Sequence, residues 1–499
     1  MSQGENDYEK ALQSLTSTIG NNISEGAKKA DSLFSLACIY RVPREFRKLK
    51  ESAYTPRLIA IGPLHQNDEH LQTPVQDIKK SYTNYLLCRL TARTPEESED
   101  EYKSTVLQEC VKEMKDCVDK ARKCYAVELD LSDDHMLEMM LASNGMTRMQ
   151  SPLVLQLETE ATEVLLLESE IKISSGQENT DPIWAAKTIQ HDLLLLENQI
   201  PFFVLEKLFR LTVDRIQNNR PCKFSLHDYV FHYFGNIVSP EENSTSSGGA
   251  TAPTTSGSPS DSTVLRISLD DQMKSSEEDG VLTSNAQRYY YHILHKLHEY
   301  CRPQTEQAKE KGLIEIMPCA SELVYAAVKF EPIPGRDLFK AEFSDPKGPF
   351  WWWQTARFKI PVLEIYDNTE LFLRNLIAFE QCCPKVSQHF TSYALLMDML
   401  VNSGRDIQLL ERAGVMRNHL GARADATNLF NNLCKGVVLD EFFFADMCSK
   451  ATAYSKRRWP KNLAHIRRTY LSSPWSFIAF CVAFIAFGIQ IVTFVQSFL

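Results

Sequence analysis

The chain has 499 residues, of which 43% are hydrophobic and 24% are charged, and its formal net charge is −10. This balance is typical of globular proteins and excludes a chain that is disordered throughout. It also lacks the basic excess of a general nucleic-acid binder, so no nucleic-acid partner is expected. The 13 cysteines occur at irregular spacing without a CxxC pair, which indicates reduced and mostly buried thiols, not a disulfide framework.

The first segment, residues 1–30, is polar and acidic at its start, which rules out an ordinary secretory signal peptide. We expect this segment to be loosely ordered. A helical body follows, and its clearest helix is predicted for 94–130. Cys110, Cys117 and Cys124 repeat every seven residues there and therefore share one helix face. Two helical turns place them about 10 Å apart, too far for one zinc ion, so the pattern favours core packing.

The stretch "HDLLLLENQIPFFVLEKLF", residues 191–209, places Glu197, Asn198 and Gln199 inside an apolar run. Pro182 is a good start for a first helix, which should weaken before Pro201, where a second helix can begin. A polar corner that braces two buried helices explains the pattern best. The alternatives are a catalytic Glu197 and a membrane hairpin, although charges cut the run below spanning length. "AFEQCCP", with Glu380 and Gln381, resembles a second corner of this kind.

A Ser/Thr-rich insertion at 239–280 cannot bury enough apolar surface to order itself. The second half resumes near residue 281 with helices and a few short strands, one of them in "FKIPVLEIYDNTE". His292, His295 and His298 lie three residues apart on a predicted helix. Because the outer two diverge by about 120°, a partly exposed helix face is favoured over a metal site. The "WWW" run at 351–353 fits either a core cover or an exposed binding surface.

The C-terminal run at 474–499 carries no charge and is longer than the roughly 20 apolar residues that cross a bilayer. It predicts one C-terminal transmembrane helix, a tail anchor. Its anchoring side chains would be Trp475, Phe477, Ile478, Phe480, Val482, Phe484, Ile485, Phe487, Ile489, Ile491, Val492 and Phe494.

A basic flank precedes this run and comprises Lys456, Arg457, Arg458, Lys461, Arg467 and Arg468. Positive flanks stay on the cytoplasmic side and attract anionic lipid, so membrane lipid is an expected partner. The predicted localisation is a single-pass protein of the plasma membrane or endomembrane with a cytoplasmic body. Glycosylation of the sequons at Asn22 and Asn243 would require the opposite topology.

The sequence has no phosphate-binding loop, no dinucleotide fingerprint, no HExxH and no GxSxG. It therefore predicts no catalytic residue, no metal, no cofactor and no identifiable small-molecule substrate. The expected fold is mainly α: a multi-helix globular body with a few short strands, plus the transmembrane helix. The predicted segments are 1–30 (polar), 31–238 (first half of the body), 239–280 (insertion), 281–455 (second half), 456–473 (basic) and 474–499 (anchor).

Several separate blocks, in order, resemble the plant family known as domain of unknown function 247. They are "IYRVPREFR", "YTPRLIAIGPLH", "DLLLLENQIPFFVLEKL", "IPVLEIYDNTELFLRNLIAFEQ" and "SYALLMDMLV". The resemblance implies a mainly helical body with a C-terminal anchor and supplies no catalytic residue. Some grass members map to self-incompatibility loci, which implies a role in recognition. The family-motif residues, interpreted as structural, are Val42, Pro43, Gly62, Pro63, Asp192, Glu197, Asn198, Gln199, Pro201, Phe202, Arg374, Asn375, Glu380 and Gln381.

Together these features predict a membrane-anchored plant protein that binds an unknown protein partner in recognition or signalling, and not an enzyme. One alternative is an enzyme of unrecognised type whose buried acids, Glu197 and Glu380, share one cleft. The other is a structural membrane tether. Perturbed titration of both acids in a pocket would favour the enzyme, whereas a dry, filled corner would favour the binding protein.

Overall fold

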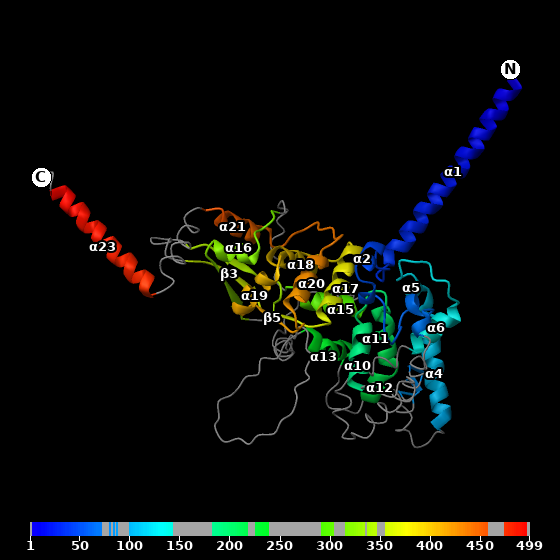
Figure 1. Cartoon of the computed structure of the whole chain (residues 1–499). Coiled ribbons are helices and arrows are strands. Elements are labelled where there is room, and N and C mark those ends of the chain that lie inside the picture. Colours follow the sequence, from blue (N-terminus) through cyan, green and yellow to red (C-terminus); the bar gives the residue numbers. More distant parts are fainter. Residues whose placement is uncertain are drawn as a thin grey trace, which may run out of the picture. The chain divides into compact units, whose positions relative to one another are not determined.

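The computed structural model describes residues 2–71, 79–80, 83–84, 86–87, 99–142, 182–217, 225–238, 291–303, 315–334, 337–346, 355–457 and 474–496. The chain forms two compact units. Unit 1 consists of Met1–Cys301 and Asn368–Ser387, and unit 2 consists of Arg302–Asp367 and Gln388–Leu499. Helices predominate and the strands are few and short (Figure 1), which confirms the predicted mainly α body. The predicted boundaries at 238 and 281 stay a prediction, because residues 239–290 lie outside the described ranges.

Unit 1 is helical in its described part. Its α-helices are α1 (Ser2–Leu36), α2 (Arg44–Leu49), α4 (Glu99–Lys115), α5 (Val118–Arg122), α6 (Asp133–Ala142), α10 (Pro182–Asp192), α11 (Phe202–Leu211), α12 (Val213–Gln217), α13 (Leu226–Val238), α15 (Ile293–Cys301) and α17 (Thr369–Cys382). Its 3-10 helices are η1 (Glu51–Ala53), η2 (Pro63–His65) and η3 (Glu69–Leu71).

Two helices differ from their predictions. The loose order expected for residues 1–30 is wrong, because α1 is one continuous helix; the segment has no proline, and its apolar residues recur at helical steps. The single helix predicted over 94–130 is divided at Asp116 and Cys117 into α4 and α5. Cys110, Cys117 and Cys124 are buried, as predicted.

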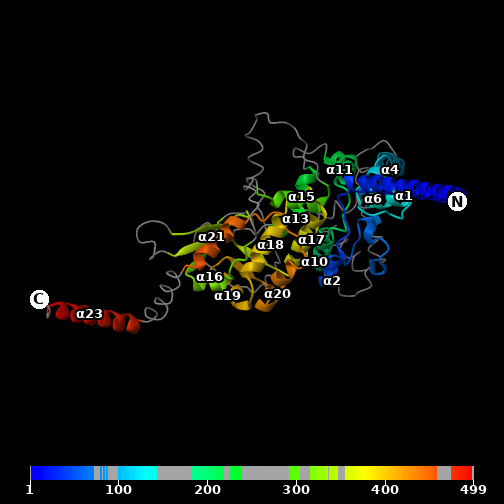
Figure 2. The same ribbon diagram turned by 90° about the horizontal axis from the view of Figure 1, so that it is seen from above.

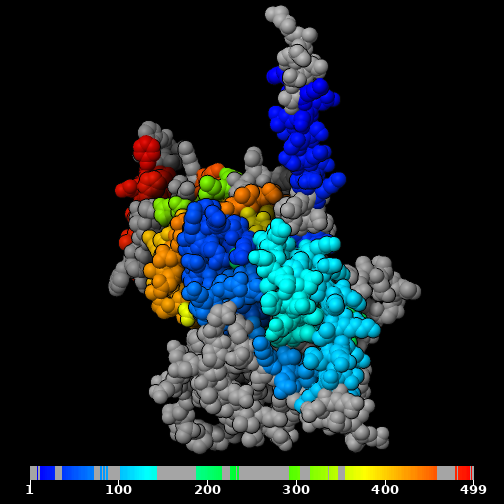
Figure 3. All heavy atoms as spheres, turned by 90° about the vertical axis from the view of Figure 1, so that its right-hand side faces the viewer, coloured from blue at the N-terminus to red at the C-terminus, as the bar shows by residue number. Residues whose placement is uncertain are grey.

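The segment that follows α1 lies beside the segment that contains α4, α5 and α6. In Figure 3 the blue surface of residues 37–71 adjoins the cyan surface of residues 99–142. A parallel bridge pairs Ile39 with Tyr125, and the amide of Ala126 donates to the Ile39 carbonyl at 2.9 Å. These backbone bonds join the first residues of the body to the end of α5.

Helix α17 belongs to unit 1, although both of its neighbours in the sequence belong to unit 2. It lies beside α15 in Figures 1 and 2. The Phe379 ring contacts His292, His295 and His298 of this region at centroid distances of 4.9, 5.5 and 5.9 Å. All three histidines are buried, so the predicted partly exposed helix face is wrong: α17 covers that face.

Unit 2 combines helices with two small sheets. Its helices are α16 (Ala320–Tyr325), α18 (His389–Leu400), α19 (Gly404–Arg412), α20 (Arg423–Leu433), α21 (Ala445–Ser455) and α23 (Pro474–Gln496), and its strands are β1 (Val328–Ile333), β2 (Glu342–Ser344), β3 (Ala356–Pro361), β4 (Leu363–Ile365) and β5 (Met416–Asn418). Strand β3 is central in the first sheet, parallel to β1 with Val328 opposite Ala356, and antiparallel to β2. Strands β4 and β5 form a parallel pair. A strand in "FKIPVLEIYDNTE" is thus confirmed, but the single strand that was predicted is divided at Val362 into β3 and β4, which belong to different sheets.

The predicted C-terminal membrane anchor is contradicted. A span needs about 20 consecutive apolar residues in one helix, and within the described ranges no helix is both long and apolar enough to cross a membrane. The predicted transmembrane helix, tail anchor and single-pass localisation are therefore wrong for the described chain. Of the twelve predicted anchor residues, the side chains of Trp475, Phe477 and Phe480 lie outside the described set, and the other nine are exposed.

The basic flank is described only at Lys456 and Arg457, and both form ion pairs inside unit 2. Lys456 lies 2.8 Å from Glu315, and Arg457 lies 2.7 Å from Asp345. The predicted flank residues Arg458, Lys461, Arg467 and Arg468 lie outside the described residues, as do residues 351–353 and the sequon at Asn243. Asn22 is exposed on α1.

Candidate functional site

The stretch between α10 and α11 forms a turn of irregular backbone instead of a helix end. Helix α10 starts at Pro182, as predicted, but it ends at Asp192, and α11 begins directly after Pro201. The side chains of Asp192, Glu197, Asn198 and Gln199 are all at most 1% exposed. Buried polar groups persist only where they are hydrogen-bonded. We use the name polar corner for these four side chains together with Asn375 of α17.

Asp192 holds the loop that begins at Arg57. Its carboxylate accepts the amides of Arg57 at 2.9 Å, Leu58 at 2.7 Å and Ile59 at 2.9 Å. Burial raises the pKa of Asp192 to about 6, and the three amides act in the opposite direction. The carboxylate thus supplies the hydrogen-bond acceptors that these three backbone amides need.

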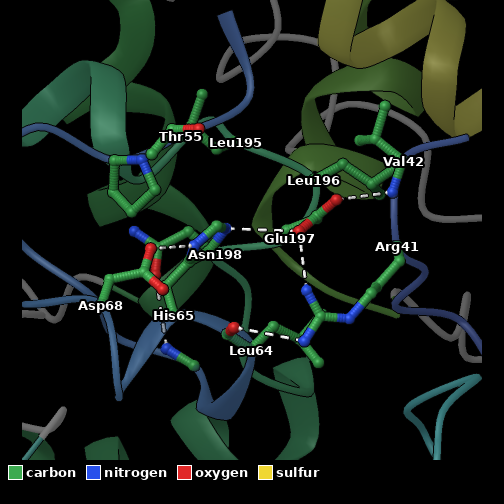
Figure 4. A network of polar contacts seen from close by, with 12 residues as sticks. Arg41, Val42, Thr55, Leu64, His65, Asp68, Leu195, Leu196, Glu197 and Asn198 are labelled. Atoms are coloured by element: carbon green, nitrogen blue, oxygen red, sulfur yellow. Dashed lines mark hydrogen bonds and ion pairs between the residues drawn. The ribbon is translucent and has the colours of Figure 1, made fainter. Parts of the chain in front are cut away.

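Glu197 is the charged centre of the polar corner (Figure 4). Its Oε1 accepts the amide of Val42 at 2.7 Å and the guanidinium of Arg47 at 2.6 Å. Its Oε2 lies 3.4 Å from His65 Nε2 and 3.6 Å from Arg41. Burial opposes the charge, but the contacts with His65, Arg47 and the Val42 amide outweigh it and hold the pKa of Glu197 below its usual value. The acid is therefore a stabilised carboxylate, not a proton donor.

Asn198 satisfies two donors and two acceptors at once. Its Oδ1 accepts the amides of Ile61 at 2.7 Å and Gly62 at 3.4 Å, and its Nδ2 donates to the carbonyls of Ile59 at 2.8 Å and Asp192 at 2.9 Å. Gly62 packs so tightly here that an added Cβ would lie 2.6 Å from the Gln199 carbonyl oxygen. Only glycine fits this contact without a shift of the backbone.

Gln199 closes the turn on itself and connects it to other elements of unit 1. Its Nε2 donates to the carbonyls of Leu193 at 2.7 Å and Leu195 at 2.9 Å. Its Oε1 accepts the Leu294 amide at 3.3 Å, and its backbone carbonyl accepts the Tyr125 hydroxyl at 3.0 Å. These bonds give the predicted polar corner its internal hydrogen bonding.

Helix α17, at whose end the second corner was predicted, joins the first corner through Asn375. Its Oδ1 accepts the Leu196 amide at 2.9 Å, and its Nδ2 donates to the Ala53 and Leu371 carbonyls at 2.8 Å each. One turn later, Glu380 accepts a hydrogen bond from His298 at 2.7 Å, with both side chains fully buried. Although burial lowers the pKa of His298, Glu299 and Glu380 outweigh it and raise that pKa to about 9.

The remaining family-motif residues lie at helix ends or are buried within unit 1. Arg374 is buried and lies 2.8 Å from Glu370 on its own helix. Pro43 precedes α2, Pro63 opens η2, and Phe202 opens α11 with its ring buried. Val42 is buried, and Gln381 is half-buried at the end of α17.

The basic side chains around Glu197 were not predicted. Arg41, Arg47 and His65 all lie in blocks that carried the family resemblance, but no role was predicted for them. The usable signal was physical: a carboxylate buried in an apolar run needs a positive partner, and "IYRVPREFR" is a basic block, although its Arg47 lies 150 residues before Glu197.

The geometry places the two candidate acids in filled, separate environments. Glu197 contacts Val42, Arg47, Arg41 and His65, whereas Glu380 contacts His298. Within the described part of the chain, no three His, Cys, Asp or Glu side chains are placed to hold a metal ion. The arrangement fixes backbone and leaves neither acid open for proton transfer.

Comparison with known proteins gives a family but no activity. A family model described as a plant protein of unknown function, DUF247, matches residues 39–489. A UPF0481 protein of Arabidopsis thaliana is 26% identical over 477 residues, covering 93% of this chain and 88% of its own. A putative UPF0481 protein of the same plant is 28% identical over 168 residues, covering 34% of this chain and 30% of its own.

No solved structure matches the chain. The family match confirms the resemblance carried by the sequence blocks and spans the polar corner. The chain belongs to the plant family DUF247, a family of unknown function.

Proposed function

We propose that this protein acts by binding protein, through the exposed apolar stripe of α1, and not by turning over a substrate. The stripe consists of Tyr8, Leu12, Leu15, Ile19 and Ile23, which are 69%, 51%, 57%, 48% and 67% exposed. This observation carries the proposal, because contiguous exposed apolar residues on a folded protein mark interaction surfaces.

The spacing makes the stripe a helix-pairing surface. Its residues follow one another at steps of four, three, four and four, which keeps them on one side of an α-helix over about four turns. The opposite side carries polar residues such as Lys10, Ser14, Asn21 and Lys28. An amphipathic helix with this division stabilises itself by covering its apolar side with another helix.

The partner we propose is α1 of a second copy of this chain. Antiparallel pairing brings Tyr8 of one copy near Ile23 of the other and covers the whole stripe on both. Ten such side chains bury roughly 1,000 Å² in total, the lower size of a specific interface. Dimerisation through α1 therefore requires no surface other than the one described.

The polar corner supports a binding function over catalysis. A general acid or base must reach the proton that it transfers, whereas Glu197 and Glu380 are buried and engaged with protein groups. The rival enzyme hypothesis required both acids in one open cleft. Their contacts instead suit a rigid body that presents a binding element.

The test is the mass of the full chain in solution, measured by light scattering after gel filtration and by sedimentation. We expect a dimer for the wild type and a monomer for Leu12→Glu/Ile19→Glu, because charge on the stripe prevents its burial. The matched control is Ser14→Glu/Asn21→Glu, which adds the same charge to the opposite side and should remain dimeric. A monomeric wild type, or equal loss of dimer in both variants, would refute the proposal.

A further inference from the structure

A pair of cysteines lies where the first residues of the body meet the end of α5. The amides of Cys38 and Ile39 both donate to the Cys124 carbonyl, at 2.8 and 2.9 Å. Direct backbone bonding of this kind places two Cα atoms about 5 to 6 Å apart, inside the range that a disulfide bridges. The two thiols also act on each other electrostatically, and the Cys124 thiol donates to the Lys120 carbonyl at 3.3 Å.

The two thiols of this pair differ in acidity. The hydrogen bond from Cys38 is the main cause that lowers the pKa of Cys124, burial opposes it, and Lys120 adds to the lowering. The same hydrogen bond and burial raise the pKa of Cys38. Cys124 is also the more exposed of the two, at 7% against 2%. In a redox-sensitive pair, one cysteine is more easily ionised and is oxidised first, and a neighbouring thiol then forms a disulfide with it. Cys124 and Cys38 have this arrangement.

We propose that Cys38 and Cys124 form an oxidation site, which hydrogen peroxide converts into an intramolecular disulfide. A small oxidant suits a site of such limited exposure. This inference is independent of dimerisation through α1, since neither cysteine belongs to the apolar stripe.

The reaction has two steps. The Cys124 thiolate attacks one peroxide oxygen, the O–O bond breaks, and the departing hydroxide takes up a proton to give water and a sulfenic acid on Cys124. The Cys38 sulfur then attacks the Cys124 sulfur, the S–O bond breaks, and the leaving hydroxide takes the Cys38 proton. Two thiols and one peroxide thus yield one disulfide and two waters, with two electrons passing from sulfur to oxygen.

The surroundings connect this site to the polar corner. The Cys38 carbonyl accepts a hydrogen bond from His292 Nε2 at 3.0 Å, and Tyr125, next to Cys124, donates to the Gln199 carbonyl. A disulfide here therefore links two segments that already hold one another through backbone bonds. It requires rotation of side chains rather than refolding of the backbone.

The competing thiols within unit 1 provide controls. Cys383 acts electrostatically on Cys38, so it is a rival for a link. Cys110 is buried, and burial raises the pKa of its thiol to about 11. A Cys110→Ser variant should leave the reaction unchanged.

The experiment uses the reduced full chain. It is exposed to hydrogen peroxide, alkylated at once and digested, and the cross-linked peptides are identified by mass spectrometry. We expect a peptide pair joined through Cys38 and Cys124. In Cys38→Ser the sulfenic acid on Cys124 should persist and react with dimedone, and in Cys124→Ser peroxide consumption should fall about tenfold.

The wild-type map decides the question even if a serine variant folds poorly. A Cys38–Cys124 link, retained in Cys110→Ser, supports the proposal. A link from Cys38 to Cys383, or free Cys38 and Cys124 at peroxide concentrations that oxidise other thiols, overturns it.

Discussion

Replacing Asn198 by Asp keeps the shape of the side chain and changes only its hydrogen-bonding groups. The Ile61 and Gly62 amides keep an acceptor, but the Ile59 and Asp192 carbonyls, at 2.8 and 2.9 Å, then face a carboxylate oxygen. Each buried carbonyl without a donor costs about 1 to 3 kcal/mol, so we expect a loss of about 4 kcal/mol. That is a large fraction of the roughly 5 to 15 kcal/mol that stabilises a typical domain.

Urea unfolding followed by circular dichroism measures this loss at pH 7. Asn67→Asp is the matched control, because Asn67 is exposed five residues after Gly62 and undergoes the same change of charge; its effect should stay within about 0.5 kcal/mol. Near pH 4 the deficit of Asn198→Asp should shrink, since a protonated carboxyl can donate to one of the two carbonyls. A loss below about 1 kcal/mol at pH 7, or equal to that of the control, would refute the role assigned to Asn198.

Four further predictions follow from particular contacts. Gly62→Ala should destabilise the chain by about 2 to 4 kcal/mol, because its Cβ would lie 2.6 Å from the Gln199 oxygen, whereas Gly26→Ala, in open space on α1, should be neutral or stabilising by thermal unfolding. Burial raises the pKa of Asp192 from 3.8 to about 6, so the folded chain binds this proton more tightly than the unfolded chain does. The resulting stabilisation is fully present below pH 4, and about 3 kcal/mol of unfolding free energy is lost as the pH rises from 4 through 6. Asp192→Asn should remove that slope from urea unfolding measured between pH 4 and 7.5, and an unchanged slope would contradict it. Ala327, at φ 66° between α16 and β1, should be replaceable by Gly with a gain of about 1 kcal/mol in unfolding free energy. Linking Cys38 to Cys124 closes a loop of over 80 residues, so the peroxide-treated wild type should gain about 4 kcal/mol over the reduced chain, and Cys38→Ser should gain nothing.

The sequence indicated the elements whose signals are local. Pro182 and Pro201 marked two helix starts correctly, and the apolar residues of "FKIPVLEI" marked a strand where β3 and β4 lie. It could not indicate that α10 ends at Asp192, because the side chain of Asp192 accepts amides that lie 133 to 135 residues away. No periodicity within one helix contains that information.

The same reason explains what was missed in the polar corner. The burial of Glu197 could be expected from its apolar neighbours, but its partners Val42 and Arg47 lie 155 and 150 residues earlier. The face that carries His292, His295 and His298 was predicted to be partly exposed, because the helix that covers it, α17, begins only at Thr369. Local patterns predict which residues share one face of a helix or strand. Which other element covers that face depends on tertiary contacts.

Because α17 belongs to unit 1, this unit cannot complete its fold until residues 302–367 of unit 2 and then α17 itself have been synthesised. The Leu196 amide and the Ala53 carbonyl are both satisfied by Asn375, which lies 179 residues after the first and 322 after the second. At roughly 5 to 20 residues per second of synthesis, a ribosome needs about 10 to 35 seconds to travel from Leu196 to Asn375. In the last part of that interval, after Cys301 has been made, unit 1 still lacks the helix that covers its histidines. Apolar surface of unit 1 therefore stays uncovered until α17 is made, and a chain that ends at Cys301 should not complete the core of this unit.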